Sequence, residues 1–276
     1  RERGFNIIIG TGEKYHRFFA AEIPGTECIN LPGFRPGYSA YLPQYLILLF
    51  QLPLLIWHSI AENFRLKKII KKRNIDIVIS DNRFGLRNRK IRSVYITHQI
   101  RIPFPEFFRF LEPAGVWLHR QVIRKFSLCI IPDLPGDLNL SGRLSHEVKL
   151  PENAIYAGIL SRFICIEDDK DGPAADPGGT VVMLSGPEPQ RSILEKKLFS
   201  LFTDSFTKTL FLAGRPDRDD QKSEDTRPCY YSHLPGSIMK KVLSGSGRII
   251  TRPGYTSVME LVSLGKSAIL IPTPGQ

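Results

Sequence analysis

The chain has 276 residues, of which 42% are hydrophobic and 24% are charged, with a formal net charge of +11. This composition excludes a disordered tail and suits one large domain or two of ordinary size. Four widely separated cysteines without a C-x-x-C pair exclude the usual zinc-finger spacings, argue against a disulfide scaffold, and fit a reducing cytoplasm.

Short apolar runs rich in β-branched residues alternate with stretches of helical periodicity along the whole chain. Their continuous hydrophobicity is typical of parallel strands covered on both faces, so we expect an α/β fold with two doubly wound, Rossmann-like domains. The expected strands are residues 5–9, 75–80, 93–97, 128–131, 154–157, 180–184, 209–213, 248–251 and 268–271. The expected helices are residues 14–22, 45–72, 106–125, 190–202, 237–243 and 257–264.

The first expected long helix lies in the most apolar part of the chain. Residues 41–60 are interrupted by Pro43, Gln51, Pro53 and His58, so their clean apolar runs are shorter than the ~20 residues of a membrane span. We expect a core or interfacial helix there. The chain starts at Arg1 and stops just after an apolar strand, and we therefore expect both ends to be truncated.

The positive charge is confined to the first half of the chain. Residues 1–150 hold 23 Lys and Arg against 12 Asp and Glu, whereas residues 151–276 hold 15 of each kind. Such a surface attracts phosphates of nucleic acid, anionic lipid or a phosphorylated substrate, although it can also be only a solvated basic surface. No aromatic RNA-binding motif, helix-turn-helix signature or zinc finger is present, so we expect no nucleic-acid partner.

A composition break separates the two halves. Residues 167–179 contain five acidic residues, two prolines and three glycines, and nothing apolar larger than alanine. This is typical of a linker. We expect a basic domain at 1–162, a linker at 163–178 and a second domain at 179–276.

Two strand-to-helix turns of the second half have the composition of a phosphate site. After residues 180–184, Gly186 allows close backbone approach, while Ser185, Arg191 and the start of the next helix offer donors. After residues 248–251 comes a second glycine turn with Gly254, followed by Glu260 inside a helix. Glu260 can accept hydrogen bonds from ribose hydroxyls, or it can form a capping box with Ser257.

A third turn, residues 272–276, follows the last strand, and Gln276 there can bind a polyol or simply lie in a surface loop. Two acidic clusters, residues 167–171 and 217–220, have the D-x-D spacing of some metal sites. Both lie in polar, loop-like sequence, which favours solvated charge over a metal site. We therefore expect no metal.

The order of these motifs resembles a known enzyme family. Residues 254–260, 261–265 and 268–272, with the terminal Gln276, are similar to the donor-site signature of family 28 glycosyltransferases, the MurG-like enzymes of GT-B fold. Residues 94–99, Val-Tyr-Ile-Thr-His-Gln, are similar to the family's strand that ends beside the acceptor. Residues 81–85 fall where the family has a glycine-containing loop, whereas the family's first phosphate loop is matched only loosely.

The resemblance implies a UDP-sugar bound in the second domain and an acceptor in the first. It implies that Glu260 holds the ribose, and that the loop with His233 and Leu234 contacts the uracil. It assigns the diphosphate to Gly254, Tyr255, Thr256, Ser185 and Arg191. No cofactor is expected, because a helix N-terminus can stabilise the leaving diphosphate.

The chain departs from the family where the catalytic base is expected. The family's glycine-rich loop with a histidine, which follows its first strand, is missing here. His98 is then the best candidate base, because it ends an expected strand and a histidine titrates near neutral pH. It can equally be a core histidine bonded to the backbone. Asp81 can orient His98 or bind the acceptor, or it can cap the following segment.

These observations favour a cytoplasmic glycosyltransferase fragment that moves a sugar, N-acetylhexosamine by resemblance, from a UDP-sugar to a hydroxyl acceptor. The basic half suggests a lipid-linked acceptor and a peripheral position at an anionic membrane surface. The alternatives are a nucleotide-sugar hydrolase or epimerase, and a nucleotide-sugar-binding subunit without catalysis.

Overall fold

The computed structural model describes residues 4–34, 36–37, 44–104, 106–166, 179–203, 208–215, 221–222 and 228–272. The chain divides into two compact units. The larger unit comprises Arg1–Pro32, Tyr38–Leu42 and Ser161–Gln276, and the smaller unit comprises Gly33–Gly37 and Pro43–Leu160. This division differs from the expected domains, because residues 1–32 cluster with the C-terminal part. The assignment of acceptor and donor roles to the two domains stays a prediction.

A six-stranded sheet forms the centre of the larger unit. Its order is β12 (Ile269–Leu270), β11 (Arg248–Thr251), β7 (Thr180–Met183), β8 (Thr209–Leu212), β10 (Cys229–Tyr231) and β9 (Gln221–Lys222). All pairings are parallel except that of β9 with β10. The chain builds outward from β7 through β8 to β10 and then crosses to β11. The sheet is therefore doubly wound, with its switch point between β7 and β11.

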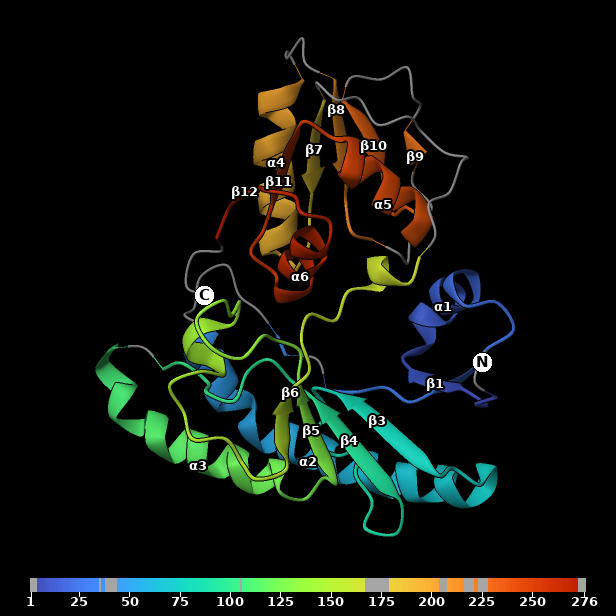
Figure 1. Cartoon of the computed structure of the whole chain (residues 1–276), viewed down its shortest axis with the longest axis vertical. Coiled ribbons are helices and arrows are strands. Elements are labelled where there is room, and N and C mark those ends of the chain that lie inside the picture. The colour runs from blue at the N-terminus through green and yellow to red at the C-terminus, as the bar shows by residue number, and fades with distance from the viewer. Residues whose placement is uncertain are drawn as a thin grey trace. The chain divides into compact units, whose positions relative to one another are not determined.

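Helices cover both faces of this sheet (Figure 1). On one face, α4 (Gln190–Phe202) packs Leu198 against Val182, Phe211 and Ile250. The other face carries α5 (Gly236–Gly245) and α6 (Tyr255–Ser263). Their side chains enclose Val181, Met183, Leu212 and Ile249 in a second core cluster. Alternate residues of each strand thus point into opposite cores, as expected for a strand buried on both faces.

The N-terminal segment forms a small parallel pair of its own within the larger unit. It contains β1 (Ile8–Thr11), η1 (Glu13–Tyr15), α1 (His16–Glu22) and β2 (Glu27–Asn30). Glu22 at the end of α1 connects it to the C-terminal part, because its carboxylate accepts a hydrogen bond from the Gly236 backbone N–H at 3.1 Å.

The smaller unit has a four-stranded parallel sheet, in the order β3 (Ile77–Asp81), β4 (Arg92–Ile96), β5 (Leu128–Ile131) and β6 (Ala154–Tyr156). Its helices are α2 (Gln44–Arg73), η2 (Glu106–Leu111) and α3 (Glu112–Ile123), and it has a short turn, η3 (Gly142–Leu144). A second short turn, η4 (Arg162–Ile164), belongs to the larger unit. Tyr95, Cys129 and Ile131 are fully buried in the core of the smaller unit together with Ile123 of α3.

The expected α/β architecture is confirmed, with three differences in detail. All nine expected strands are present, whereas β2, β9 and β10 were not expected. The expectation of strands covered on both faces is wrong for β3, where Ile77 and Ile79 are 46% and 65% exposed. The strand order of the smaller unit is also sequential rather than reversed, because β1 pairs with β2 instead of joining this sheet.

No helix in the described part of the chain is long and apolar enough to cross a membrane. This includes α2, which is 30 residues long, contains Pro53 and ends in Lys71, Lys72 and Arg73.

Candidate functional site

A pocket of about 290 Å³ opens at the switch point of the six-stranded sheet. The turn after β7 and the turn after β11 form it, because these two strands are hydrogen-bonded neighbours and end at the same edge. Its lining is Ser185, Gly186, Pro187, Arg252, Pro253, Gly254, Tyr255, Thr256 and Ser257. The structure thus brings together two of the turns that the sequence indicated. Ligands of open α/β sheets bind at such switch points.

Gly186 and Arg252 approach each other closely inside this pocket. Arg252 Nη1 donates a hydrogen bond of 2.9 Å to the Ser185 carbonyl, and the Arg252 residue is only 4% exposed. Gly186 has φ +97°, and a Cβ added to it would lie 2.3 Å from Arg252 Nη1. The positive φ favours glycine here, and a Cβ would require the Arg252 guanidinium to shift.

The N-terminus of α6 forms the opposite wall of the pocket. Gly254 is its N-cap residue, and its carbonyl accepts a hydrogen bond of 3.0 Å from the Val258 N–H. The first N–H groups of a helix have no acceptor within the helix, and the helix dipole adds a partial positive charge at this end. With the Arg252 guanidinium and the Ser185 hydroxyl, the pocket has the donors and the positive charge that an anion such as a diphosphate requires.

Glu260 lies deeper in α6 and does not line the pocket. The residue is 6% exposed, and its Oε1 accepts a hydrogen bond of 2.8 Å from Arg162 Nε. Burial raises the pKa of the Glu260 carboxyl, and the Arg162 charge partly opposes that rise. The capping-box alternative is wrong, because the N-cap is Gly254 and Ser257 lies inside the helix. The expected contact of Glu260 with ribose stays a prediction.

Arg191 is at the start of α4 and is also absent from the pocket lining. Its guanidinium is 3% exposed, forms ion pairs with Glu188 and Glu195, and donates to the Ala213 carbonyl at 3.1 Å. These acceptors hold Arg191 on the α4 side of the sheet. Arg252, which the sequence analysis did not select, is instead the arginine of the pocket. Its position directly after β11 was the sequence feature that could have identified it.

The expected uracil loop follows β10. Leu234 is 4% exposed and belongs to the core between the sheet and α5, so its side chain packs rather than faces solvent. His233 Nε2 lies 3.5 Å from Glu22 Oε1, and its ring is in edge contact with Phe18. Burial lowers the pKa of His233, while Glu22 raises it. The role of this loop in binding a base stays a prediction.

Gln276 lies outside the described residues, and so do both acidic clusters, at 167–171 and 217–220, for which the sequence favoured solvated charge over a metal site. Within the described ranges, no three His, Cys, Asp or Glu side chains gather in a way that could hold a metal ion.

The candidate base His98 and Asp81 are in the smaller unit, after β4 and at the end of β3. The parallel register pairs Asp81 with Ile96, so both residues are at the carboxyl edge of this sheet. Burial lowers the pKa of His98, and the charge of Asp133 raises it. A neutral imidazole at neutral pH suits a general base. Burial also raises the pKa of Asp81.

Asp133 is a residue that the sequence analysis missed. It follows β5 by two positions, is fully buried, and accepts hydrogen bonds from the N–H groups of Leu134, Leu140 and Ser141 at 2.8 to 2.9 Å. Burial alone would raise the pKa of its carboxyl, but these bonds and one from the Ser141 hydroxyl lower it overall. Asp133 is thus a fixed negative charge that acts on His98. Its position just after a strand was the available signal.

Solved glycosyltransferases share this fold. The spinosyn rhamnosyltransferase SpnG in complex with thymidine diphosphate matches 99% of this chain over 75% of its own length, with 11% identity and a TM-score of 0.59. The kitacinnamycin glycosyltransferase matches 100% of this chain over 75% of its own, with 14% identity and a TM-score of 0.58. SnogD from Streptomyces nogalater gives the same coverage and identity, with a TM-score of 0.56.

No protein-family model matches the sequence, and no curated protein matches it significantly. At these low identities the structural likeness shows the fold alone, which is the GT-B glycosyltransferase fold. The closer resemblance to the MurG-like family stays a prediction.

Proposed function

We propose that this protein is a glycosyltransferase that moves a sugar from a nucleoside diphosphate sugar to a hydroxyl acceptor. The observation that carries the proposal is the pocket at the β7–β11 switch point, where the Arg252 guanidinium and the N-terminus of α6 line one cavity. Hydrogen-bond donors of this kind bind a diphosphate, and a diphosphate is also the leaving group of sugar transfer.

In this reaction the acceptor hydroxyl attacks the anomeric carbon of the sugar. The bond between that carbon and the diphosphate oxygen breaks, and the configuration inverts. Arg252 and the helix N–H groups stabilise the negative charge that develops on the departing diphosphate. His98, neutral because burial lowers its pKa, is the candidate that accepts the hydroxyl proton.

The finer features of the proposal rest on the sequence. UDP as the nucleotide, N-acetylhexosamine as the sugar and a base contact at His233 and Leu234 follow from the resemblance to MurG-like enzymes. A lipid-linked acceptor and a position at an anionic membrane surface follow from the charge of the first half of the chain. The glycosyltransferase structures that share the fold agree with the reaction class, and one of them is complexed with thymidine diphosphate.

Calorimetric titration of the whole chain with UDP, thymidine diphosphate and GDP tests the donor site. We expect UDP to bind most tightly, and equal binding of all three or no binding would contradict the UDP assignment. Incubation with a UDP-sugar in the absence of acceptor then tests the reaction. Release of free sugar or formation of an isomer would instead favour a hydrolase or epimerase, and intact UDP-sugar with every hydroxyl acceptor tried would favour a binding subunit.

A further inference from the structure

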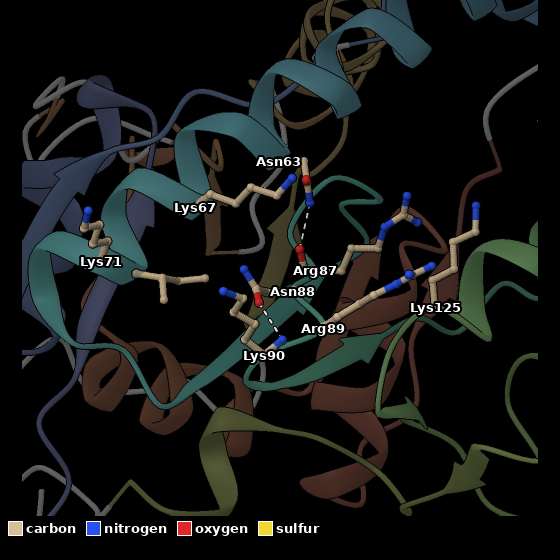
Figure 2. A pocket seen from close by; sticks show the side chains of 9 residues that line it. Asn63, Lys67, Lys71, Arg87, Asn88, Arg89, Lys90 and Lys125 are labelled. Atoms are coloured by element: carbon tan, nitrogen blue, oxygen red, sulfur yellow. Dashed lines mark hydrogen bonds between the residues drawn. The ribbon is translucent and has the colours of Figure 1, made fainter.

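A second hollow, of about 740 Å³, lies in the smaller unit and is lined mainly by cationic side chains (Figure 2). Three segments form it: the second half of α2, the connection between β3 and β4, and the turn that follows α3. Asn63, Ile70 and Asn88 contribute to its wall. Its six cations are Lys67, Lys71, Arg87, Arg89, Lys90 and Lys125. We call it the basic pocket.

The basic pocket is at the opposite end of the sheet from the candidate base. Lys90 comes two residues before β4 and Lys125 three residues before β5, so both are at the amino ends of parallel strands. His98 and Asp81 lie at the carboxyl ends, where ligands of open α/β sheets normally bind. The basic pocket is therefore not part of an acceptor site built at the carboxyl ends of this sheet.

The described part of the chain does not compensate this positive charge. Among the described residues, none of the six cations forms an ion pair with a carboxylate. Lys67 instead lies over the Phe64 ring at 5.3 Å. Burial lowers the pKa of Arg87, and the neighbouring Arg89 charge lowers it further. Like charges gathered in one hollow repel one another, so they favour binding of a polyanion that relieves this repulsion.

The connection that carries three of these cations is fixed in place. Asn63 Nδ2 donates to the carbonyls of Gly85 and Arg87 at 3.0 and 2.7 Å. The Asn88 N–H donates to Ser93 Oγ at 2.9 Å, and Ser93 Oγ donates back to the Asn88 carbonyl at 3.1 Å. Gly85 is so close to α2 that an added Cβ would lie 2.3 Å from the Ser59 carbonyl oxygen.

This close packing matters for binding, because a fixed backbone keeps the cations together before any ligand arrives. In Figure 2, Arg87, Arg89 and Lys125 lie on one side of the basic pocket, and Lys67 extends toward them from α2, whereas the Lys71 side chain lies farther along this helix. Such an arrangement can contact one compact anion from two sides. Arginine forks bind phosphate oxygens in pairs, while lysines add point charges.

We propose that the basic pocket binds a ligand with two or more adjacent phosphate groups, at a site separate from the pocket at the β7–β11 switch point. The shared chemistry is that of a free polyphosphate and of a polyphosphorylated lipid head group. Clustered phosphates match six cations better than a single carboxylate does, because they bring several negative charges into one small volume.

The test is calorimetric titration of the whole chain with inorganic tripolyphosphate. The variant Arg89→Gln, Lys90→Gln, Lys125→Gln removes three exposed cations and leaves the bonds of Asn63 intact. We expect it to bind tripolyphosphate at least about tenfold more weakly. The control Lys149→Gln, Lys196→Gln, Lys197→Gln removes the same charge from exposed positions outside the pocket, and we expect nearly unchanged affinity. Equal weakening in both variants, or no binding by the wild type, would overturn the proposal.

Two further measurements separate the possible sources and the two sites. Phosphatidylcholine vesicles that contain phosphatidylinositol bisphosphate are sedimented with the chain. Release of bound chain by tripolyphosphate identifies a lipid head group as a source, and tripolyphosphate binding without vesicle binding identifies a soluble ligand. Tripolyphosphate titration is repeated in Arg252→Lys, where we expect the affinity to persist even if UDP binding is lost. Loss of tripolyphosphate binding in Arg252→Lys alone would move the site to the switch-point pocket and contradict the proposal.

Discussion

Arg162 Nε donates a 2.8 Å hydrogen bond to Glu260 Oε1, and this ion pair joins residues that are 98 positions apart. The Glu260 side chain is 7% exposed, whereas that of Arg162 is 34% exposed and also lies over the Phe163 ring. The pair fixes η4 to α6 in the larger unit. The carboxylate that the sequence suggested for ribose is therefore also a structural contact.

Removal of Arg162 and removal of Glu260 should lower the free energy of unfolding by different amounts. Arg162→Gln leaves a buried carboxylate without its cation, and we expect the free energy of unfolding to fall by about 1–3 kcal/mol. Glu260→Gln leaves a cation that water can reach, so the loss should be smaller. Urea unfolding of both variants measures the difference. A larger loss in Glu260→Gln would show that the carboxylate stabilises the fold through contacts other than Arg162.

The same Glu260→Gln variant separates the structural from the binding role. If Glu260 also accepts hydrogen bonds from ribose hydroxyls, UDP affinity should fall about tenfold, which corresponds to about 1.4 kcal/mol. Arg162→Gln supplies the matched control, because it disturbs the same ion pair and retains the carboxylate. Unchanged UDP affinity in Glu260→Gln would limit Glu260 to its contact with Arg162.

Arg252 and Arg191 offer a matched comparison in one unit. Both are almost fully buried, but only Arg252 lines the switch-point pocket. Arg252→Lys should weaken UDP binding about tenfold or more, because a lysine cannot reproduce the paired donors of a guanidinium. Arg191→Lys should lower the free energy of unfolding by about 2–4 kcal/mol, since it disturbs the ion pairs with Glu188 and Glu195. Calorimetry with UDP and urea unfolding of each variant measure both effects.

One outcome would assign the diphosphate contact to Arg191 and the structural role to Arg252. UDP affinity lost in Arg191→Lys and retained in Arg252→Lys would return the diphosphate contact to Arg191, as the sequence suggested.

Gly186 allows a steric test of the same pocket. Gly186→Ala places a Cβ where Arg252 Nη1 now lies and strains a backbone with φ +97°, so we expect about 1–3 kcal/mol of destabilisation and weaker UDP binding. Gly254→Ala is the control, because its added Cβ would be 3.4 Å from the nearest atom, Ser185 Oγ, and its φ of −66° suits alanine. Thermal melts with and without UDP measure the stability of each variant and its UDP binding. Equal effects of the two substitutions would contradict a specific role for the approach of Gly186 and Arg252.

The sequence predicted the strands that bury continuous apolar residues. β7 is such a strand, and its four residues are fully buried. The sequence did not predict β10 or β9. These strands have three and two residues, and so few residues give no periodicity. β2 is also short, and its two half-buried residues lie side by side between exposed ends, so its burial does not alternate.

The candidate site was predictable to the level of its turns and no further. A strand followed by glycine and a helix identified the loops at Gly186 and Gly254. Which arginine faces the pocket depended on tertiary contacts, because Glu195 and the Ala213 carbonyl hold Arg191 elsewhere. The effect of Asp133 on His98 also depended on the fold, since Asp133 follows the strand that pairs with β4 in the sheet.

Two histidines of the smaller unit, the buried His119 and the half-buried His98, predict a pH dependence of stability. Burial lowers the pKa of His119 and of His98, so the folded state keeps both neutral where the unfolded chain begins to bind protons. The stability they contribute is therefore fully present above about pH 6.5, the ordinary histidine pKa, and is lost as the pH falls toward the lower folded values. Each such proton changes the free energy of unfolding by at most about 1.4 kcal/mol per pH unit. His119 Nδ1 lies 3.1 Å from the Ile100 carbonyl oxygen, and a glutamine amide can donate to the same oxygen.

The free energy of unfolding of His119→Gln should therefore fall less steeply with decreasing pH than that of the wild type. Urea unfolding at a series of pH values between 7.5 and 5, the range that brackets the ordinary histidine pKa of about 6.5, measures the slope. A slope that His119→Gln leaves unchanged would show that His119 does not carry this dependence. A slope that is reduced but not abolished would assign the remainder to other groups, which include His98 and His233, because burial lowers the pKa of these rings as well.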